Sequence, residues 1–140
     1  MKLFNTIQSY LSLVKFSHSI FALPFAMIGF FVAIHSDQFH PLNYEKLLLI
    51  LLCMITARNA AMAFNRWADR SIDSRNKRTA QREIPSGLIT SNAALGFIIM
   101  NCLIFVGSSF FINKLCFYLS PIALFVILGY SYTKRFSWLC

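Results

Sequence analysis

Three polar residues recur at every fourth position in the middle of the chain, Asn65, Asp69 and Asp73. Positions four apart on an α-helix lie on one face, one turn above another, so the three side chains would form a single stripe. Carboxylates one turn apart, with an amide oxygen beside them, suit a hard divalent cation. Mg²⁺ usually takes one or two protein carboxylates and fills its shell with water and substrate phosphates. The stripe has no histidine or thiolate, the ligands that indicate a softer metal.

Basic residues surround these acids. Guanidinium and ammonium groups match phosphate oxygens, so acid and base together predict a diphosphate held through magnesium. The alternative is a solvated helix end, in which Asp69 and Asp73 pair with neighbouring bases at about 0.2–0.5 kcal/mol for each pair. Seven of the 13 basic residues lie in this part of the chain: Arg58, Arg66, Arg70, Arg75, Lys77, Arg78 and Arg82.

Arg58 favours the functional alternative. It lies seven residues before Asn65, on roughly the same helical face, and inside an apolar run. A charged side chain within a membrane span is costly and usually faces a functional cavity or a partner. A nucleic acid would also fit a basic patch. A cytoplasmic loop of a membrane protein explains the patch better, because basic loops stay in the cytoplasm.

The composition indicates a chain solvated by lipid. Of its 140 residues 57% are hydrophobic and 13% are charged, against about 25% charged in a soluble domain. Four cysteines without CxxC spacing predict free thiols. Four runs approach the roughly 20 apolar residues that a membrane-crossing helix needs. We therefore predict an all-α bundle of transmembrane helices in the lipid bilayer, with no nucleic acid as partner and with spans at about 16–34, 47–64, 93–112 and 115–132.

The distribution of lysine and arginine predicts the orientation of these spans. The basic loop at 66–87 should be cytoplasmic. An even number of crossings then places the N-terminus and the Lys134–Arg135 end on the same side. The two links on the other side carry only Lys46 and Lys114, so the assignment is self-consistent.

These motifs resemble those of the UbiA-type membrane prenyltransferases, the family of 4-hydroxybenzoate polyprenyltransferase. The NxxxDxxxD pattern at Asn65, Asp69 and Asp73 continues into a KRTxxRxxPSG-like run. A YxxxKR pattern follows in the last span, and Lys15 with the LPFA run at 23–26 is similar to the family's first helix. The residues of the run and of the last motif are Lys77, Arg78, Thr79, Arg82, Pro85, Ser86 and Gly87, and Tyr130, Lys134 and Arg135.

The resemblance implies the first half of a nine-helix membrane prenyltransferase with a central cavity. It implies Mg²⁺ as cofactor, a polyprenyl diphosphate and an aromatic acceptor such as 4-hydroxybenzoate as substrates, and a place in ubiquinone or menaquinone biosynthesis at a bacterial inner membrane. Arg58 or Arg135 would hold the acceptor carboxylate. By resemblance, Asn65, Asp69 and Asp73 would bind the metal. Asp69, Asp73 and Arg135 would be catalytic. The substrates would contact Arg58, Asn65, Arg66, Lys77, Arg78, Arg82, Tyr130 and Lys134.

The chain departs from the family in one respect. Family members are about twice as long and carry a second aspartate motif, whereas the only acids here are Asp37, Glu45, Asp69, Asp73 and Glu83. We expect either the N-terminal portion of a longer enzyme or a truncated product that needs a second chain for activity. Two further hypotheses are a small four-span transporter subunit and a lipid-diphosphate binder without catalysis. Magnesium-dependent binding separates the transporter from the others, and product formation separates the enzyme from the binder.

Overall fold

The described part of the chain is mostly α-helical. This computed structural model describes residues 2–15, 20–35 and 44–136, and their side chains except at 2–5, 33, 35 and 133–136. No strand occurs within these ranges, which confirms the all-α prediction. The helices are α1 (Lys2–Leu13), α2 (Leu23–His35), α3 (Tyr44–Arg75), α4 (Ser91–Ile112) and α5 (Lys114–Phe136).

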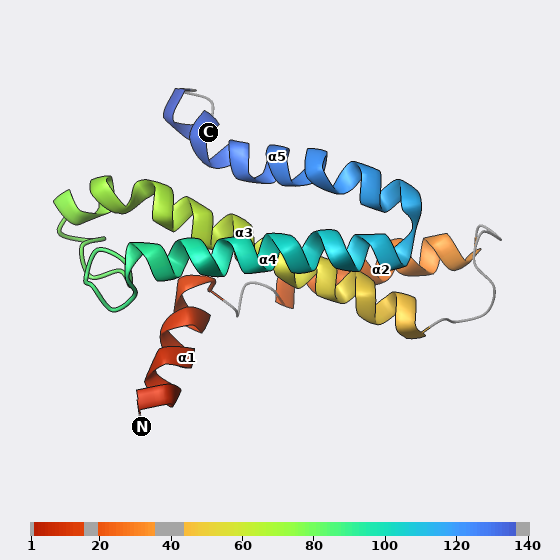
Figure 1. Cartoon of the computed structure of the whole chain (residues 1–140), viewed down its shortest axis with the longest axis horizontal. Helices are drawn as coiled ribbons and strands as arrows, with labels where there is room; N and C mark the ends of the chain where they lie inside the picture. Colours follow the sequence, from red (N-terminus) through yellow and green to blue (C-terminus); the bar gives the residue numbers. More distant parts are fainter. Residues whose placement is uncertain (1, 16–19, 36–43, 137–140) are drawn as a thin grey trace.

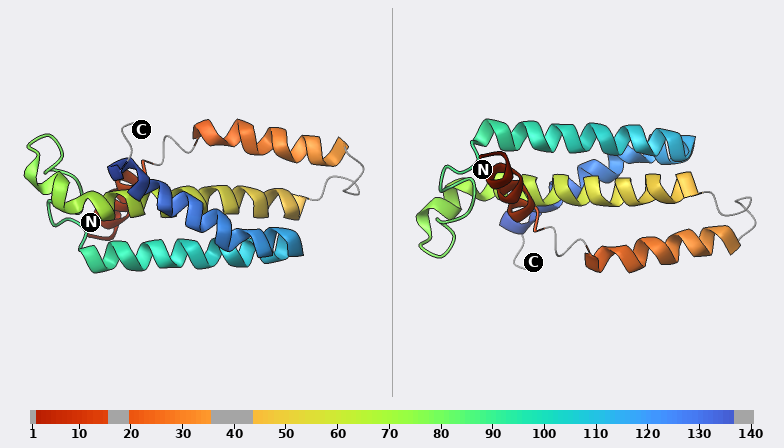
Figure 2. Two further views of the ribbon diagram at one scale, coloured as in Figure 1. Left: turned by 90° about the horizontal axis from the view of Figure 1, so that it is seen from above. Right: turned by 90° about the horizontal axis from the view of Figure 1, so that it is seen from below.

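Helices α3 and α4 make the most extensive contact, and they pack antiparallel along most of the length of α4 (Figure 1). Helix α5 folds back from the end of α4 and contacts both, while α2 lies along α3 (Figure 2). Helix α1 differs from the others because it projects from the bundle at a steep angle to α3 and α4, near the end where α3 leads into α4 (Figures 1 and 2).

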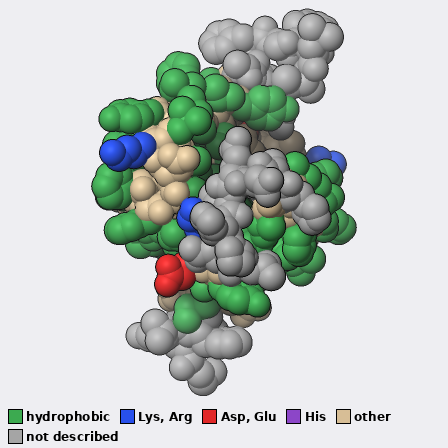
Figure 3. Space-filling view, turned by 90° about the vertical axis from the view of Figure 1, so that its right-hand side faces the viewer, with side chains coloured by type: hydrophobic (Ala, Val, Ile, Leu, Met, Phe, Trp, Pro, Cys, Tyr) green, Lys and Arg blue, Asp and Glu red, His purple; other side chains and the backbone are tan. Residues whose placement is uncertain are grey.

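Three described helices are long and apolar enough to cross a membrane, and they contain the last three of the four expected spans. The first expected span, 16–34, corresponds to the shorter apolar helix at Ile20–Val32, and residues 16–19 lie outside the described residues. Large apolar side chains such as Leu103, Phe111 and Phe125 are exposed on α4 and α5, as lipid contact requires. The end of the bundle where α4 turns into α5 is also mostly hydrophobic, with few charged side chains (Figure 3).

The prediction of one basic loop at 66–87 is wrong in its first half. Helix α3 continues without a break to Arg75. Its 32 residues span about 48 Å at 1.5 Å per residue, whereas the hydrocarbon core is about 30 Å thick. The last turns of α3 therefore extend beyond the apolar layer, and Arg75 in the final turn interacts favourably with the helix dipole.

Residues 76–90 form an irregular but compact connection between α3 and α4. Gly87 has φ 79°, a left-handed conformation that glycine adopts without steric cost. The amide of Ile89 donates to the carbonyl of Glu83 at 2.9 Å. Thr90 then caps α4, because its hydroxyl accepts from the amide of Ala93 at 3.3 Å, as N-cap threonines do.

Helix α5 remains continuous across Pro121, which removes one backbone donor from the helix. The carbonyl of Phe117 would otherwise accept the missing N–H. Instead the hydroxyl of Ser120 donates to that carbonyl at 2.8 Å. A neighbouring serine thus satisfies the group that proline frees, which is how membrane helices accommodate proline.

The buried core lies at the end of the bundle that carries the connection. It combines α1, α3, the connection and α4, with aromatic residues such as Trp67 and Phe97 packed against it. Helix α1 was not predicted from the sequence, yet Leu13 at its end is fully buried. The core residues are Leu13, Ala63, Ile84, Ile89, Ala94 and Ile98.

Candidate functional site

The predicted stripe lies on one continuous helix. Asn65, Asp69 and Asp73 all belong to α3, so the four-residue spacing places them one turn apart along a single face. Asp73 is buried, whereas Asn65 and Asp69 are partly exposed. The stripe begins where the apolar part of α3 ends and continues into the projecting turns. It therefore lies at the boundary between lipid and water.

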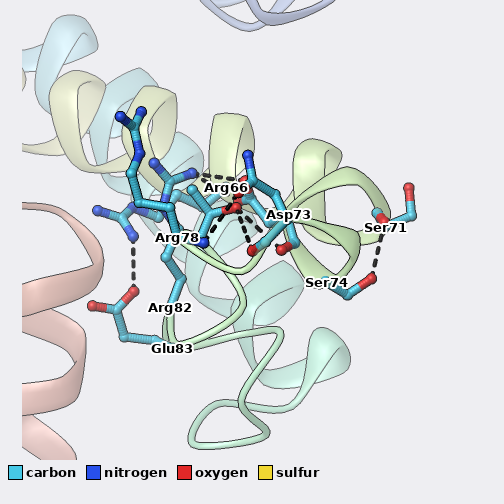
Figure 4. Close-up of polar contacts among 9 residues, drawn as sticks. Arg66, Ser71, Asp73, Ser74, Arg78, Arg82 and Glu83 are labelled. Carbon is cyan, nitrogen blue, oxygen red and sulfur yellow. Dashed lines mark hydrogen bonds and ion pairs between the residues drawn. The ribbon is translucent and has the colours of Figure 1, made fainter.

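Asp73 is held by the connection that follows α3. One guanidinium nitrogen of Arg82, Nη1, donates to both carboxylate oxygens of Asp73, at 2.9 and 2.8 Å (Figure 4). The hydroxyl of Thr79 donates to the backbone carbonyl of Asp73 at 3.1 Å. The side chain of Arg82 is 38% exposed and that of Asp73 is 9% exposed. The connection therefore folds back onto the stripe and brings a cation to its last carboxylate.

A second ion pair lies beside the first and is more deeply buried. Arg66 on α3 donates to Glu83 at 2.9 Å, and the two side chains are 9% and 12% exposed (Figure 4). The hydroxyl of Ser12 on α1 also donates to the Glu83 carboxylate. Arg82 and Glu83, which are adjacent in the connection, thus each form an ion pair with a residue of α3. Through the hydrogen bond that it accepts from Ser12, Glu83 also contacts α1.

Glu83 was missed as a site residue by sequence reasoning. It is a single acid in a strongly basic stretch, directly after Arg82. That isolation among cations could have indicated that Glu83 pairs with one of them. Burial of a carboxylate requires a paired cation. Arg66 meets that requirement here, so in this structure its guanidinium is engaged in the protein interior.

The remaining predicted basic residues of the connection lie at its surface. Lys77 and Arg78 are exposed, and the backbone amide of Arg78 donates to the side-chain oxygen of Asn76 at 3.0 Å. Exposed cations next to Asp73 can meet an anion that approaches from water. Together with Arg82 they give this end of α3 its positive charge.

Arg58 is in a different environment. Its Nε atom is buried and has no hydrogen-bond partner among the described residues, and the same is true of Oδ1 of the neighbouring Asn59. A buried unpaired polar atom costs about 1–3 kcal/mol, so such atoms require an explanation. A bound anionic or polar ligand would provide one.

The predicted motif of the last span is only partly described. Tyr130 lies on α5 with its side chain exposed, and the side chains of Lys134 and Arg135 lie outside the described part. The Tyr132 ring meets Phe64 edge-on at a centroid distance of 5.7 Å. The final turns of α5 are therefore adjacent to α3 directly before Asn65, and the structure brings these two motifs to the same end of the bundle.

The donor set of the stripe fits a hard cation. It supplies carboxylate oxygens from Asp69 and Asp73 and an amide oxygen from Asn65, which are ligands that Mg²⁺ prefers. No group of three histidine, cysteine or acidic residues is assembled within the described ranges. The contacts of Asp73 with Arg82 leave lone pairs on both carboxylate oxygens, because an ionised carboxylate has about four acceptor sites.

The chain is similar to proteins of one family. A model of the UbiA prenyltransferase family matches residues 22–140. The 4-hydroxybenzoate octaprenyltransferase of Aliivibrio fischeri (strain MJ11) is 35% identical over 101 residues, which are 69% of this chain and 34% of that protein. The enzyme of the same name from Actinobacillus pleuropneumoniae serotype 5b (strain L20) is 35% identical over 92 residues, 65% of this chain and 31% of that protein.

A solved structure shares the fold. The apo structure of a UbiA homolog from Aeropyrum pernix K1 superposes with a TM-score of 0.75 at 31% identity, over 85% of this chain and 42% of the other. The chain spans about a third of the length of the curated relatives it matches. The similarity covers the stripe, the connection and the last span together.

Proposed function

This chain belongs to the UbiA prenyltransferase family, and from that premise we propose that it acts in the transfer of a polyprenyl group from its diphosphate to an aromatic acceptor resembling 4-hydroxybenzoate. In this reaction the allylic C–O bond of the diphosphate breaks and a bond to a ring carbon forms. The ring carbon loses a proton and diphosphate leaves. The relatives named as 4-hydroxybenzoate octaprenyltransferases support this choice of substrates.

The observation that carries the proposal is the position of the aspartate stripe. Asp69 and Asp73 lie where the apolar part of α3 ends, and Arg82 reaches Asp73 from the connection. A polyprenyl diphosphate has a charged head and a long apolar tail. A site at this boundary can hold the head near water while the tail lies among apolar helices.

In the proposed site, Asn65, Asp69 and Asp73 would hold Mg²⁺, which would neutralise the negative charge that grows on the departing diphosphate. Arg82, Lys77 and Arg78 would bind the remaining phosphate oxygens, because a guanidinium or ammonium group near the leaving group stabilises the same charge. The residues Tyr130, Lys134 and Arg135 would complete the site from α5. Arg66 would contribute by orienting the connection through Glu83, in addition to any direct contact.

Arg58 would hold the carboxylate of the acceptor. Its buried Nε atom has no hydrogen-bond partner among the residues described, and a guanidinium can grip a carboxylate with two parallel hydrogen bonds. This role can be tested by comparing 4-hydroxybenzoate with phenol, which lacks the carboxylate. Arg58→Gln should weaken binding of 4-hydroxybenzoate by about tenfold, the equivalent of 1.4 kcal/mol, and leave binding of phenol unchanged. Equal effects on both ligands would contradict this role.

The membrane topology is part of the proposal. The positive-inside rule would place the connection 76–90 and the N-terminus in the cytoplasm of a bacterial inner membrane. The aspartate stripe would then open to the cytoplasm, where Mg²⁺ and a soluble aromatic acid are available. Modification of cysteines introduced at exposed Lys77 and exposed Lys114, using a reagent that does not cross membranes, would test this orientation in intact cells.

The direct test is binding of a polyprenyl diphosphate to the full 140-residue chain in lipid nanodiscs. We expect binding that requires Mg²⁺ and is lost with a chelator, and we expect Asp69→Asn to weaken it by at least about tenfold. Glu45→Gln is the matched control, because it removes a carboxylate from the opposite end of the same helix. Binding without magnesium, or equal affinities in the two variants, would contradict the site. Incubation with the acceptor then distinguishes an enzyme from a diphosphate binder by product formation.

A further inference from the structure

Helix α1 lies outside the part of the chain that matches the family model. The match begins at residue 22, and α1 spans Lys2–Leu13. It projects from the bundle, roughly perpendicular to the spans, near the end that carries the connection (Figures 1 and 2). A helix perpendicular to membrane-crossing helices lies parallel to the membrane plane.

Helix α1 is fixed to the bundle at its C-terminal end. Leu13 and Val14 are buried, and the Tyr10 ring packs against Phe97 of α4 at a centroid distance of 5.0 Å. The hydroxyl of Ser12 donates to Glu83 in the connection. The orientation of α1 is therefore set by three separate contacts, which also determine which face it turns towards the membrane.

The apolar face of α1 is on the membrane side of the helix. Ile7, Tyr10 and Leu11 line a cavity of about 320 Å³ together with Asn59 of α3 and Phe97 of α4. The polar face is on the other side. Gln8, Ser9 and Ser12 line a cavity of about 370 Å³ with Gln81 and Glu83 of the connection.

The positions of these two cavities along the axis of the bundle can be compared. Trp67 Nε1 donates to Ser91 Oγ at 2.9 Å, which places these residues of α3 and α4 at one level. Asn59 is eight residues, about 12 Å, from that level towards the middle of α3, and Phe97 is about 9 Å towards the middle of α4. Glu83 pairs with Arg66, next to Trp67. The apolar face thus points to the bilayer interior and the polar face to the connection.

Two apolar side chains on the inner face remain uncovered. Ile7 is 51% exposed and Leu11 is 45% exposed, and residues four apart present one continuous strip. The sequence places lysines at both ends of this segment, Lys2 and Lys15. An amphipathic helix that lies in the membrane interface immerses such an apolar strip among the lipid chains, and each lysine near an anionic surface adds about 1 kcal/mol of attraction.

We propose that α1 is an interfacial helix that lies on an anionic lipid surface, with Ile7 and Leu11 immersed among the lipid chains. Because Ser12 of α1 donates to Glu83, α1 would hold the connection at a constant distance from the membrane surface. The partner is bilayer lipid because the uncovered strip faces the same direction as the apolar turns of α3 and α4. The inference is independent of catalysis, so the site proposed above can fail while this one holds.

Spin labels on the full chain test this inference. In a background with Cys53, Cys102, Cys116 and Cys140 replaced by serine, single cysteines are placed at 7 and 11 on the apolar face and at 8 on the polar face. The protein is reconstituted in vesicles of phosphatidylethanolamine and phosphatidylglycerol. Phe125→Cys, at a position 79% exposed on α5, is the lipid reference, and exposed Lys77→Cys is the water reference.

We expect oxygen, which partitions into lipid, to relax the labels at 7 and 11 more strongly than a water-soluble nickel chelate does. The opposite order is expected at 8. Stronger relaxation by the chelate at all three positions would overturn the proposal, because the face would then lie in water. Weak relaxation by both reagents at 7 and 11 would also overturn it, because a second copy or another protein segment would then cover the face.

A second measurement needs no substitution. Hydrogen exchange of the α1 amides is compared between nanodiscs of phosphatidylcholine alone and nanodiscs that also contain phosphatidylglycerol. A lysine near an anionic surface changes the binding equilibrium by about fivefold, so anionic lipid should slow exchange in α1 by at least this factor. The α4 amides serve as the internal control and should not change. Equal exchange of α1 in the two lipids would overturn the assignment to an anionic surface.

Discussion

The two ends of the α3–α4 interface are stabilised differently. At the end that carries the connection, charged side chains pair across segments: Arg66 with Glu83, and Asp73 with Arg82. In the apolar half, hydroxyl and amide side chains donate to the backbone of their own helix, and weak contacts of the Cys53 thiol cross the interface, to Ser109 Oγ at 3.7 Å and to the Phe105 carbonyl at 3.9 Å. Ser109 donates to the carbonyl of Phe105 at 2.8 Å.

Other residues of the apolar half follow the same pattern. Thr56 donates to the carbonyl of Leu52 at 2.7 Å, and the amide of Asn101 donates to the carbonyl of Phe97 at 2.8 Å. Backbone carbonyls satisfy these side chains within lipid, where water is not available. The polar groups of this half therefore let α3 and α4 approach closely, whereas those of the other half determine where the connection lies. Arg58 and Asn59 lie on α3 between these two regions, and each has a buried polar atom without a hydrogen-bond partner among the described residues.

The largest effect should come from Glu83→Gln. It leaves the Arg66 guanidinium buried without a compensating charge, and breaking a buried pair in this way typically costs about 3–5 kcal/mol. Thermal and denaturant unfolding in detergent would measure the loss. The double variant Arg66→Met/Glu83→Met should recover most of it, because both charges are then removed. A single variant that unfolds like the parent chain would show that the pair does not hold this end together.

Close packing of the two helices should be the next most sensitive feature. Ala94→Leu adds three carbons at a fully buried position on α4 and should cost about 1–3 kcal/mol of unfolding free energy. Ala93→Leu is the matched control, since Ala93 is the exposed neighbour and leucine and alanine have similar helix propensities. If the two variants were equally stable, the close contact of α3 with α4 at this level would be disproved.

The second ion pair should matter less and should depend on salt. Arg82 is partly exposed but its partner Asp73 is buried, so Arg82→Gln should cost about 1 kcal/mol, the low end of the cost of leaving a buried group without its partner. Raising the salt from about 0.1 M to about 1 M shortens the screening length from about 10 Å to 3 Å, and the difference from the parent chain should then shrink. The Glu83→Gln difference should persist, because that pair is buried. Equal salt dependence of the two variants would remove the distinction between the pairs.

The smallest effect is expected in the apolar half. Ser109→Ala removes a hydroxyl that donates to its own helix and also lies 3.7 Å from Cys53 Sγ on α3, and even hydrogen bonds between membrane helices contribute only about 0.6 kcal/mol on average. We expect a loss of that size or less in the same unfolding assay. A loss above about 2 kcal/mol would mean that Ser109 acts across the interface, and the contrast between the two halves would no longer hold.

Some features of the site depended only on local geometry and were predicted. The register of Asn65, Asp69 and Asp73 follows from helical periodicity alone, and the structure places all three on α3. The last three spans follow from the length of their apolar runs. Magnesium binding, and the roles of Lys134 and Arg135, stay predictions.

Other features were predicted inconsistently, or could not be predicted from the spacing of residues in the sequence. The spacing of Asn65, Asp69 and Asp73 predicts a helix as far as Asp73, whereas the loop bounds of 66–87 disagree with that helix, and the structure decides in favour of the helix, which ends at Arg75. Helix α1 was missed because it is short and only half apolar. Glu83 was passed over as an isolated acid, although it is the residue that joins α3 to α1.

Composition and short-range spacing were sufficient to predict an all-helical membrane chain with an aspartate stripe and a basic segment near one end of a span. Those properties depend on composition and on spacings of a few residues, which helical geometry converts directly into a shared face. The contacts of Arg82 with Asp73 and of Glu83 with Arg66, and the steep angle at which α1 projects from the bundle, appear only in the folded molecule (Figure 1). These contacts depend on how the connection 76–90 folds back, and no local periodicity encodes that path.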